Sequence, residues 1–271
     1  MEKQPPGQDP RAAVHERVQS QFGAAAVAYT SSGVHSDPEA LRQVVTLAHP
    51  APGDFALDIA TGAGHTALAL APHVAKVVAY DLTPEMLRET RRNAESRGLV
   101  NVFTQEGAAE ALPFPDSSFD IVTVRQAPHH FADVRRAVRE MVRVGKSGAR
   151  VVIVDSTSPD DDLLDRQWNR IEKLRDPSHV RNYRPDEWRA MLQQEGLSIT
   201  FERVDFCLEN GRAMDFAAWT RRMNTPAPAV EELDQLFRNA SPELAQALRI
   251  QVAGPAIFFC VPQITLAAVK A

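Results

Sequence analysis

The stretch Leu57-Asp58-Ile59-Ala60-Thr61-Gly62-Ala63-Gly64-His65 decides the fold. An apolar run ends there in a turn with two glycines, and a helical segment follows from Thr66. Glycine at 62 and at 64 allows a tight turn and a close approach of the backbone to a ligand. The start of the following helix offers N–H groups to an anionic group. The stretch therefore predicts a strand–turn–helix unit with a ligand at the turn.

Short apolar runs and amphipathic stretches alternate on both sides of this unit. Near-continuous β-branched runs are typical of strands that are buried on both faces. Strands alternating with helices indicate a parallel sheet that helices cover on both sides. The predicted strands are residues 55–60, 74–80, 100–104, 119–124 and 150–154, and the predicted helices are 66–71, 84–97 and 134–144.

The ends of the chain have other compositions. Residues 1–13 are rich in Pro, Gln and charge, and we expect a disordered tail. Residues 14–50 predict a helical lid whose second helix is capped by Asp37 and starts at Pro38. Residues 51–155 form the predicted cofactor-binding core. Residues 156–271 predict a strand at 198–206, a helical insertion at 212–252 that covers the acceptor side, and a last strand at 256–269, all within one domain from 14 to 271.

The composition excludes several classes of protein. With 30 Lys+Arg against 35 Asp+Glu, the formal net charge of -5 argues against a nucleic-acid partner. No apolar run approaches the roughly 20 residues of a membrane span. We therefore expect a cytoplasmic monomer or homodimer without a metal. Cys207 and Cys260 lie far apart, so we predict two buried apolar residues rather than a disulfide framework.

The ligand at the glycine turn is predicted to contain adenosine. Asp81 ends the second predicted strand, about 20 residues after the turn, where an acid can accept hydrogen bonds from ribose hydroxyls. Gly62, Gly64 and Ala67 also fit the dinucleotide pattern, so an NAD-linked oxidoreductase is one hypothesis. Asp58 would repel a pyrophosphate but attract the ammonium and sulfonium of S-adenosylmethionine. Charge therefore favours S-adenosylmethionine.

Three ordered motifs resemble those of the class I S-adenosylmethionine-dependent methyltransferases of the domain 11/25 type, in the subgroup that includes the ubiquinone/menaquinone C-methyltransferases. They are residues 57–65, residues 80–87 (YDLTPEML) and residues 106–120 (EGAAEALPFPDSSFD). The resemblance implies a Rossmann-like, seven-stranded, mostly parallel α/β sheet with an antiparallel last strand. It also implies methyl transfer to a small-molecule acceptor, at carbon, oxygen or nitrogen.

The resemblance assigns the first motif to the methionine moiety, Asp81 to the ribose, and Leu82 and Met86 to the adenine. The residues that it implies for the cofactor are Tyr29, Asp58, Ala60, Thr61, Gly62, Gly64, Asp81, Leu82, Met86, Ala108, Ala109, Glu110, Arg125 and Gln126. Two positions depart from the family. Ala60 replaces its first glycine, and Ala108 replaces an acid, so either Glu110 substitutes for that acid or the contact is missing.

Methyl transfer needs a placed acceptor and, for many acceptors, a base. His129 and His130 follow the fourth predicted strand, and we expect at most one of them to face the cleft as a base. The alternative is that they cap or pack the next helix, which would also suit a non-catalytic S-adenosylmethionine-binding protein. We predict a pocket for a cyclic or aromatic metabolite. The alternative, which such residue types more often represent, is a solvated helix-entry loop and core aromatics. The residues are His179, Arg181, Tyr183, Trp219 and Phe258.

Overall fold

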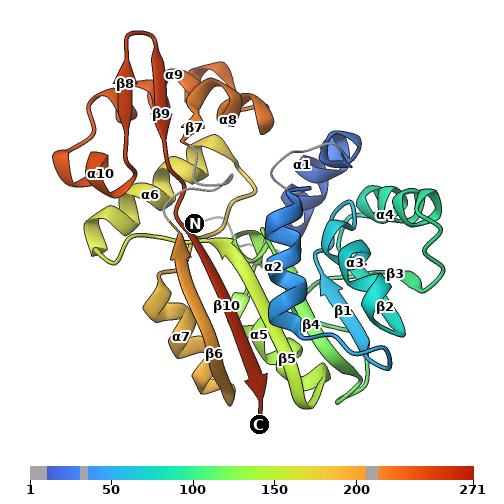
Figure 1. Ribbon diagram of the computed structural model, residues 1–271. Helices are drawn as coiled ribbons and strands as arrows, with labels where there is room; N and C mark the ends of the chain where they lie inside the picture. Colours follow the sequence, from blue (N-terminus) through green and yellow to red (C-terminus); the bar gives the residue numbers. More distant parts are fainter. Residues whose placement is uncertain (1–10, 31–35, 206–212) are drawn as a thin grey trace, which may run out of the picture.

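A seven-stranded sheet forms the centre of the molecule (Figure 1), a computed structural model that describes residues 11–30, 36–205 and 213–271. Its strand order is β3-β2-β1-β4-β5-β10-β6. Strand β10 runs antiparallel to both of its neighbours, and the pairs among β1–β5 are parallel. This confirms the predicted fold. The strands are β1 (Phe55–Ile59), β2 (Lys76–Asp81), β3 (Val102–Glu106), β4 (Phe119–Arg125), β5 (Gly145–Ser156), β6 (Leu197–Asp205) and β10 (Gln263–Lys270).

Helices cover both faces of the sheet because alternate strand residues are apolar on both sides. In β1, Leu57 and Ile59 pack into the core beneath α5 (Val134–Val144) and α7 (Pro185–Gln194). Ala56 points the other way, toward α2 (Pro38–Ala48) and α3 (His65–Leu70). Helix α4 (Pro84–Ser96) lies against β2 and β3 and contacts α1 (Ala12–Thr30). The predicted cap of α2 is confirmed, since Asp37 accepts a hydrogen bond from the Glu39 N–H.

A second unit lies beyond the carboxyl ends of the parallel strands (Figure 1). It packs α6 (Asp162–Arg175), α8 (Phe216–Arg222), α9 (Ala227–Arg238) and α10 (Pro242–Ala247) with a small sheet of order β7-β9-β8. These strands are β7 (Met214–Asp215), β8 (Gln251–Ala253) and β9 (Ala256–Phe259). The unit has its own apolar core, which includes Trp168, Trp219, Phe237 and Phe259. We call it the cap.

The single last strand predicted at 256–269 is wrong, because the chain changes sheets at Cys260. Its N–H donates to the carbonyl of Leu248 in the cap, and Pro262 has no N–H for a ladder. As a result Phe259 packs in the core of the cap and Ile264 in that of the main sheet. Apolar residues continue across this break, so the sequence pattern shows one run.

Smaller differences concern the ends of elements and the cysteines. Helix α1 begins at Ala12, inside the predicted tail, and β5 begins at Gly145, five residues before the predicted start. Cys260 is buried but disulfide-bonded, so the prediction of a plain apolar residue is wrong there. Cys207 lies outside the described residues. Among the residues that are described, none of the helices has the length and apolarity to cross a membrane.

Candidate active site

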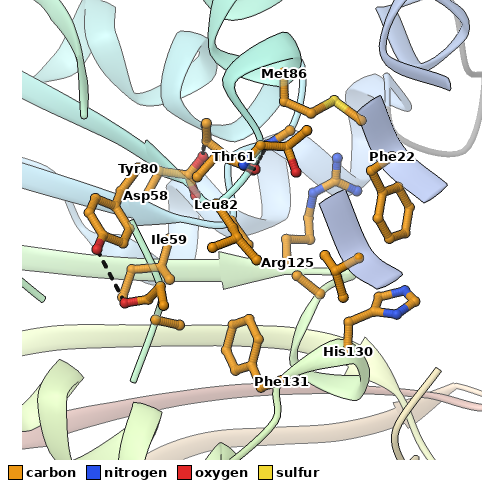
Figure 2. Close-up of a pocket in the computed structure, with 18 of the residues that line it drawn as sticks. Phe22, Asp58, Ile59, Thr61, Tyr80, Leu82, Met86, Arg125, His130 and Phe131 are labelled. Carbon is orange, nitrogen blue, oxygen red and sulfur yellow. Dashed lines mark hydrogen bonds between the residues drawn. The ribbon is translucent and has the colours of Figure 1, made fainter. Parts of the chain in front are cut away.

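The larger cavity lies where the carboxyl ends of β1, β2 and β4 meet beneath α1 (Figure 2). Connections leave β1 and β4 in opposite directions along the sheet, and ligands bind at such a switch point in open α/β sheets. The volume of this first cavity is about 940 Å³ when the space open to solvent is counted. Of the implied cofactor residues whose side chains the structure describes, every one lines it except Gly64. Tyr29 belongs to α1, but its side chain lies outside the described residues.

The two glycines of the turn have different roles. Both have a positive φ, which disfavours any side chain. A Cβ built on Gly62 meets no atom within 4 Å, so the backbone there is open to the cavity. A Cβ on Gly64 would lie 2.8 Å from the Cγ2 atom of Thr90, so Gly64 serves the packing of α3 on α4. Ala60, in place of the family's first glycine, adopts φ 52° and is strained.

Asp81 presents its carboxylate on the wall of the first cavity. One oxygen accepts a hydrogen bond from the Gly62 N–H at 2.8 Å, and the other accepts one from the Thr83 N–H at 2.8 Å. Burial raises the pKa of Asp81 to about 6, against the lowering effect of these two N–H groups. A carboxylate oxygen can accept more than one hydrogen bond, so Asp81 can also receive hydroxyls of a ligand.

Asp58 holds the glycine turn in place. Its carboxylate accepts hydrogen bonds from the Thr61 hydroxyl at 2.6 Å, the Thr123 hydroxyl at 2.7 Å and the Ala67 N–H at 3.2 Å. Burial raises the pKa of Asp58, whereas these donors and the charge of Arg125 act in the opposite direction. Asp58 therefore contributes negative charge to the cavity wall while its own oxygens are bonded within the protein.

Ala108 stands where the family has an acid, so this position supplies no carboxylate to the cavity. The Ala108 carbonyl accepts a hydrogen bond from the Tyr80 hydroxyl (Figure 2). Glu110 lines the cavity, but one of its oxygens accepts the N–H groups of Ala132 and Asp133 and the other lies 3.3 Å from His15 of α1. Each carboxylate oxygen can accept a further hydrogen bond, so Glu110 has the capacity to take the place of the family's acid.

A second cavity adjoins the first and shares Phe22, Gln126 and His130 with it. Its volume is about 580 Å³, and it lies between the cap and the ends of β4 and β5. Its polar side chains come from the ends of β4 and β5 and from α6 and α8 of the cap, and its apolar side chains come from α1 and from other parts of the cap. The residues that line it are Phe22, Gln126, His129, His130, Ser156, Glu172, Arg175, Asp176, Met214, Trp219, Arg222, Met223 and Val261.

His129 is oriented by a buried acid at the end of β5. Its Nδ1 lies 2.5 Å from the Oδ1 atom of Asp155, and its backbone N–H donates to Oδ2 at 2.8 Å. Burial lowers the pKa of His129, but the carboxylate of Asp155, with Glu172 and Asp176 farther away, outweighs burial and raises it above its ordinary value. With Nδ1 held in this way, Nε2 is the ring nitrogen that can meet a ligand.

His130 has the opposite character. Its Nδ1 lies 3.2 Å from the Ser178 hydroxyl, and its ring packs edge-on against Phe22 at 4.9 Å between centroids. Burial, with the adjacent charge of His129, lowers its pKa to about 3. Both histidines line the second cavity, which corrects our expectation that only one would face it. The short 3₁₀ helix Pro128–His130 places the two rings side by side, 4.1 Å apart.

Four of the five residues predicted for the acceptor pocket line neither cavity. His179 is buried beside Asn169, and burial lowers its pKa. Arg181 pairs with acids at 165 and 187, Tyr183 packs on a tryptophan at 188, and Phe258 lies in the small sheet. Only Trp219 lines the second cavity. The loop at 176–183 instead supports the site, since the N–H groups of residues 180 and 181 donate to the His129 carbonyl.

Asp155 is the main residue that the sequence analysis missed. It directly follows the predicted strand 150–154, as Asp81 follows its own strand, and acids at such ends point toward the ligand edge of a parallel sheet. That signal was available in the sequence. By contrast, Glu172, Arg175 and Arg222 lie on helices of the cap, and nothing in the local sequence indicates which way they face.

The fold and the first cavity are those of a Rossmann-like protein with a ligand site at the strand ends. Residues 57–153 match the methyltransferase domain family. Over 251 residues the chain is 37% identical to the "uncharacterized methyltransferase YcgJ" of Bacillus subtilis, covering 92% of this chain and 97% of that protein. The YcgJ crystal structure superposes with a TM-score of 0.80 over 86% of this chain and 98% of that chain.

A second relative is the demethylmenaquinone methyltransferase of Thermus thermophilus, 42% identical over 120 residues, which are 44% of this chain and 54% of that protein. The chain therefore belongs to the S-adenosylmethionine-dependent methyltransferase family and is an enzyme with methyltransferase activity. The resemblance in the three motifs is confirmed. Between the two hypotheses for the glycine turn, the family decides in favour of methyl transfer over an NAD-linked oxidoreductase.

Proposed function

We propose that this enzyme transfers a methyl group from S-adenosylmethionine in the first cavity to a small cyclic or aromatic acceptor in the second. The observation that carries the proposal is the junction of the two cavities. They share Phe22, Gln126 and His130, so ligands in both cavities would meet there. An in-line displacement requires two ligands to approach each other in this way.

The residues of the first cavity fit such a donor. S-adenosylmethionine, when bound, supplies an electrophilic methyl group on a sulfonium. Asp81 would accept the ribose hydroxyls, and the open backbone at Gly62 would allow close approach. Leu82 and Met86 supply apolar walls for a flat base (Figure 2). Asp58 adds negative charge that suits a cationic donor better than a pyrophosphate.

His129 is the better candidate for the base of the pair. It lines the second cavity but not the first, and so belongs to the acceptor side. Asp155 would fix the ring so that Nε2 faces the acceptor, and would stabilise the positive charge that the ring gains with a proton. His130 keeps a low pKa and packs against Phe22. We assign it to the wall between the two ligands.

Calorimetry tests the donor site directly. Wild-type protein is titrated with S-adenosylhomocysteine, with S-adenosylmethionine and with NAD. We expect the first two to bind and NAD to bind at least tenfold more weakly. Asp81→Ala should abolish measurable binding of the adenosyl ligands, whereas Asp116→Ala, an exposed acid away from both cavities, should not. Tight binding of NAD alone would contradict the proposal.

A further inference from the structure

We propose that His15 of α1 and Glu110 together bind the edge of the donor's adenine ring. His15 donates a hydrogen bond to the ring nitrogen N1, and Glu110 accepts one from the 6-amino group. These roles rest on the proposed function and go beyond it, because they name the groups that distinguish adenine from another base. They concern the part of the first cavity where Ala108 replaces the family's acid.

Helix α1 lies along the first cavity. His15, Val18 and Phe22 line the cavity, and their spacing places them on one face of the helix. Phe22 also lines the second cavity and packs against His130 at the junction (Figure 2). His15 precedes Phe22 by about 10 Å along the helix axis. The face therefore extends from the junction, where the methyl group of the donor would lie, to the end where its base would lie.

Two contacts fix this end of α1 beside the donor site. The side-chain amide of Gln19 donates to the carbonyl of Leu82 at 2.9 Å, and Nε2 of His15 lies 3.3 Å from Oε2 of Glu110. Leu82 follows β2, and Glu110 follows β3. Ligands bind at the carboxyl ends of such parallel strands. His15 therefore lies beside the segments that the resemblance assigns to adenine.

The two oxygens of the buried Glu110 carboxylate have different partners. Oε1 accepts the N–H groups of Ala132 and Asp133, which fix the carboxylate at the start of α5. Oε2 faces Nε2 of His15, a buried atom without a hydrogen-bond partner in the described part of the chain. A carboxylate close to Nε2 favours the tautomer with the proton on this nitrogen. The pair therefore offers an acceptor and a donor next to each other on the wall of the cavity.

The edge of adenine has the complementary pattern. Its 6-amino group donates a hydrogen bond, and the adjacent N1 accepts one. Hypoxanthine has the reverse pattern, with an oxygen at position 6 and a proton on N1. A ligand that leaves buried polar groups unpaired binds much more weakly. His15 and Glu110 should therefore select adenine and disfavour hypoxanthine.

Calorimetry with two ligands that differ only in the base tests these roles. The protein is titrated with S-adenosylhomocysteine and with S-inosylhomocysteine, which carries hypoxanthine in place of adenine. We expect the wild-type protein to bind the adenosyl ligand at least tenfold more tightly. His15→Leu should lower the affinity for the adenosyl ligand about fivefold and leave that for the inosyl ligand nearly unchanged. Glu16→Ala, at the exposed neighbouring position of α1, is the matched control and should keep the wild-type preference.

Glu110→Gln should reverse the preference. The amide keeps an oxygen for the N–H groups of α5 and places an NH₂ group where Oε2 was, which suits the 6-oxygen of hypoxanthine. We expect this variant to bind the inosyl ligand at least as tightly as the adenosyl ligand. His15→Leu leaves the contacts of Glu110 with α5 in place, so the test does not depend on the folding of Glu110→Gln.

Equal affinity of the wild-type protein for the two ligands overturns the inference, as does a wild-type preference in His15→Leu. If neither ligand binds to the wild-type protein, the proposed function fails instead, so the two failures are distinguishable.

Discussion

The two cavities share a wall, but their acids have different partners. In the first, Asp58 and Asp81 are bonded to backbone N–H groups and hydroxyls, which do not change charge. In the second, Asp155 and Glu172 are bonded to a histidine and an arginine. The partners of Asp58 and Asp81 keep the same charge at every ordinary pH, whereas the histidine that Asp155 holds can gain or lose a proton. Binding of the donor and chemistry on the acceptor should therefore respond to different mutations.

The largest difference between the effect on turnover and the effect on donor affinity is expected for His129→Asn. Loss of a general base lowers turnover by about 10²–10⁴, while the first cavity, which His129 does not line, keeps its ligand. Turnover is measured with labelled donor, and affinity for S-adenosylhomocysteine by calorimetry. His73→Asn, in the short 3₁₀ helix Ala71–His73, serves as the control. Loss of turnover and of donor affinity together would show that the two cavities are not separate.

The converse change is Asp81→Asn. The amide keeps the size of the side chain but removes the negative charge that accepts hydrogen bonds from the ligand hydroxyls. Losing hydrogen bonds to a charged group costs about 2 kcal/mol of binding free energy. We expect affinity for S-adenosylhomocysteine to fall about 30-fold. Undiminished affinity would remove Asp81 from the donor site.

The pH dependence of donor binding also tests whether the charged form of Asp81 binds the donor. Asp81 in the free protein has a pKa of about 6, raised by burial, and hydroxyl donors bind its charged form. Below that pKa the ligand must displace a proton, so we expect affinity for S-adenosylhomocysteine to be about tenfold weaker at pH 5 than at pH 7. Calorimetry across this range should show no such step in Asp81→Asn. A step that persists in the variant would belong to another group.

The same raised pKa affects the stability of the free protein. The folded state binds the Asp81 proton more tightly than the unfolded chain does, so protonation of Asp81 adds to the free energy of unfolding. This added stability is complete below pH 3.8 and is lost as the pH rises to about 6. Bound ligand removes the effect because it favours the charged carboxylate. Denaturant unfolding with and without ligand checks the sign.

The smallest expected effect concerns the strain at Ala60. An alanine at φ 52° costs about 1 kcal/mol or more relative to glycine. Glycine also increases the conformational entropy of the unfolded chain, which offsets part of the gain in stability. Ala60→Gly should therefore raise the Tm by about 2 °C without changing donor affinity. Ser117→Gly, at φ 54° and away from both cavities, is the matched control. A lower Tm for Ala60→Gly alone would mean that Ala60 makes contacts that glycine loses.

Local patterns predicted the parts that depend on neighbouring residues. Helix α5 covers the predicted residues 134–144, and Asp37 caps α2 as expected. Asp81 reaches the glycine turn because parallel strands β1 and β2 end at the same edge. The last strand was mispredicted because no local signal shows that Phe259 and Ile264 belong to different cores. Similarly, His179 has a typical catalytic residue type, but its surroundings bury it.

The sequence by itself determined the α/β sheet, the glycine turn and the acid that follows the second strand. Strand and helix periods and turn chemistry act over a few residues, and the end of each strand fixes where its next side chain lies. Only the tertiary structure decided that Asp155 orients His129, that Glu110 is bonded to the start of α5, and that α6 and α8 complete a second cavity. Those contacts join residues 22 or more positions apart, and long-range packing alone selects which of many polar side chains meet.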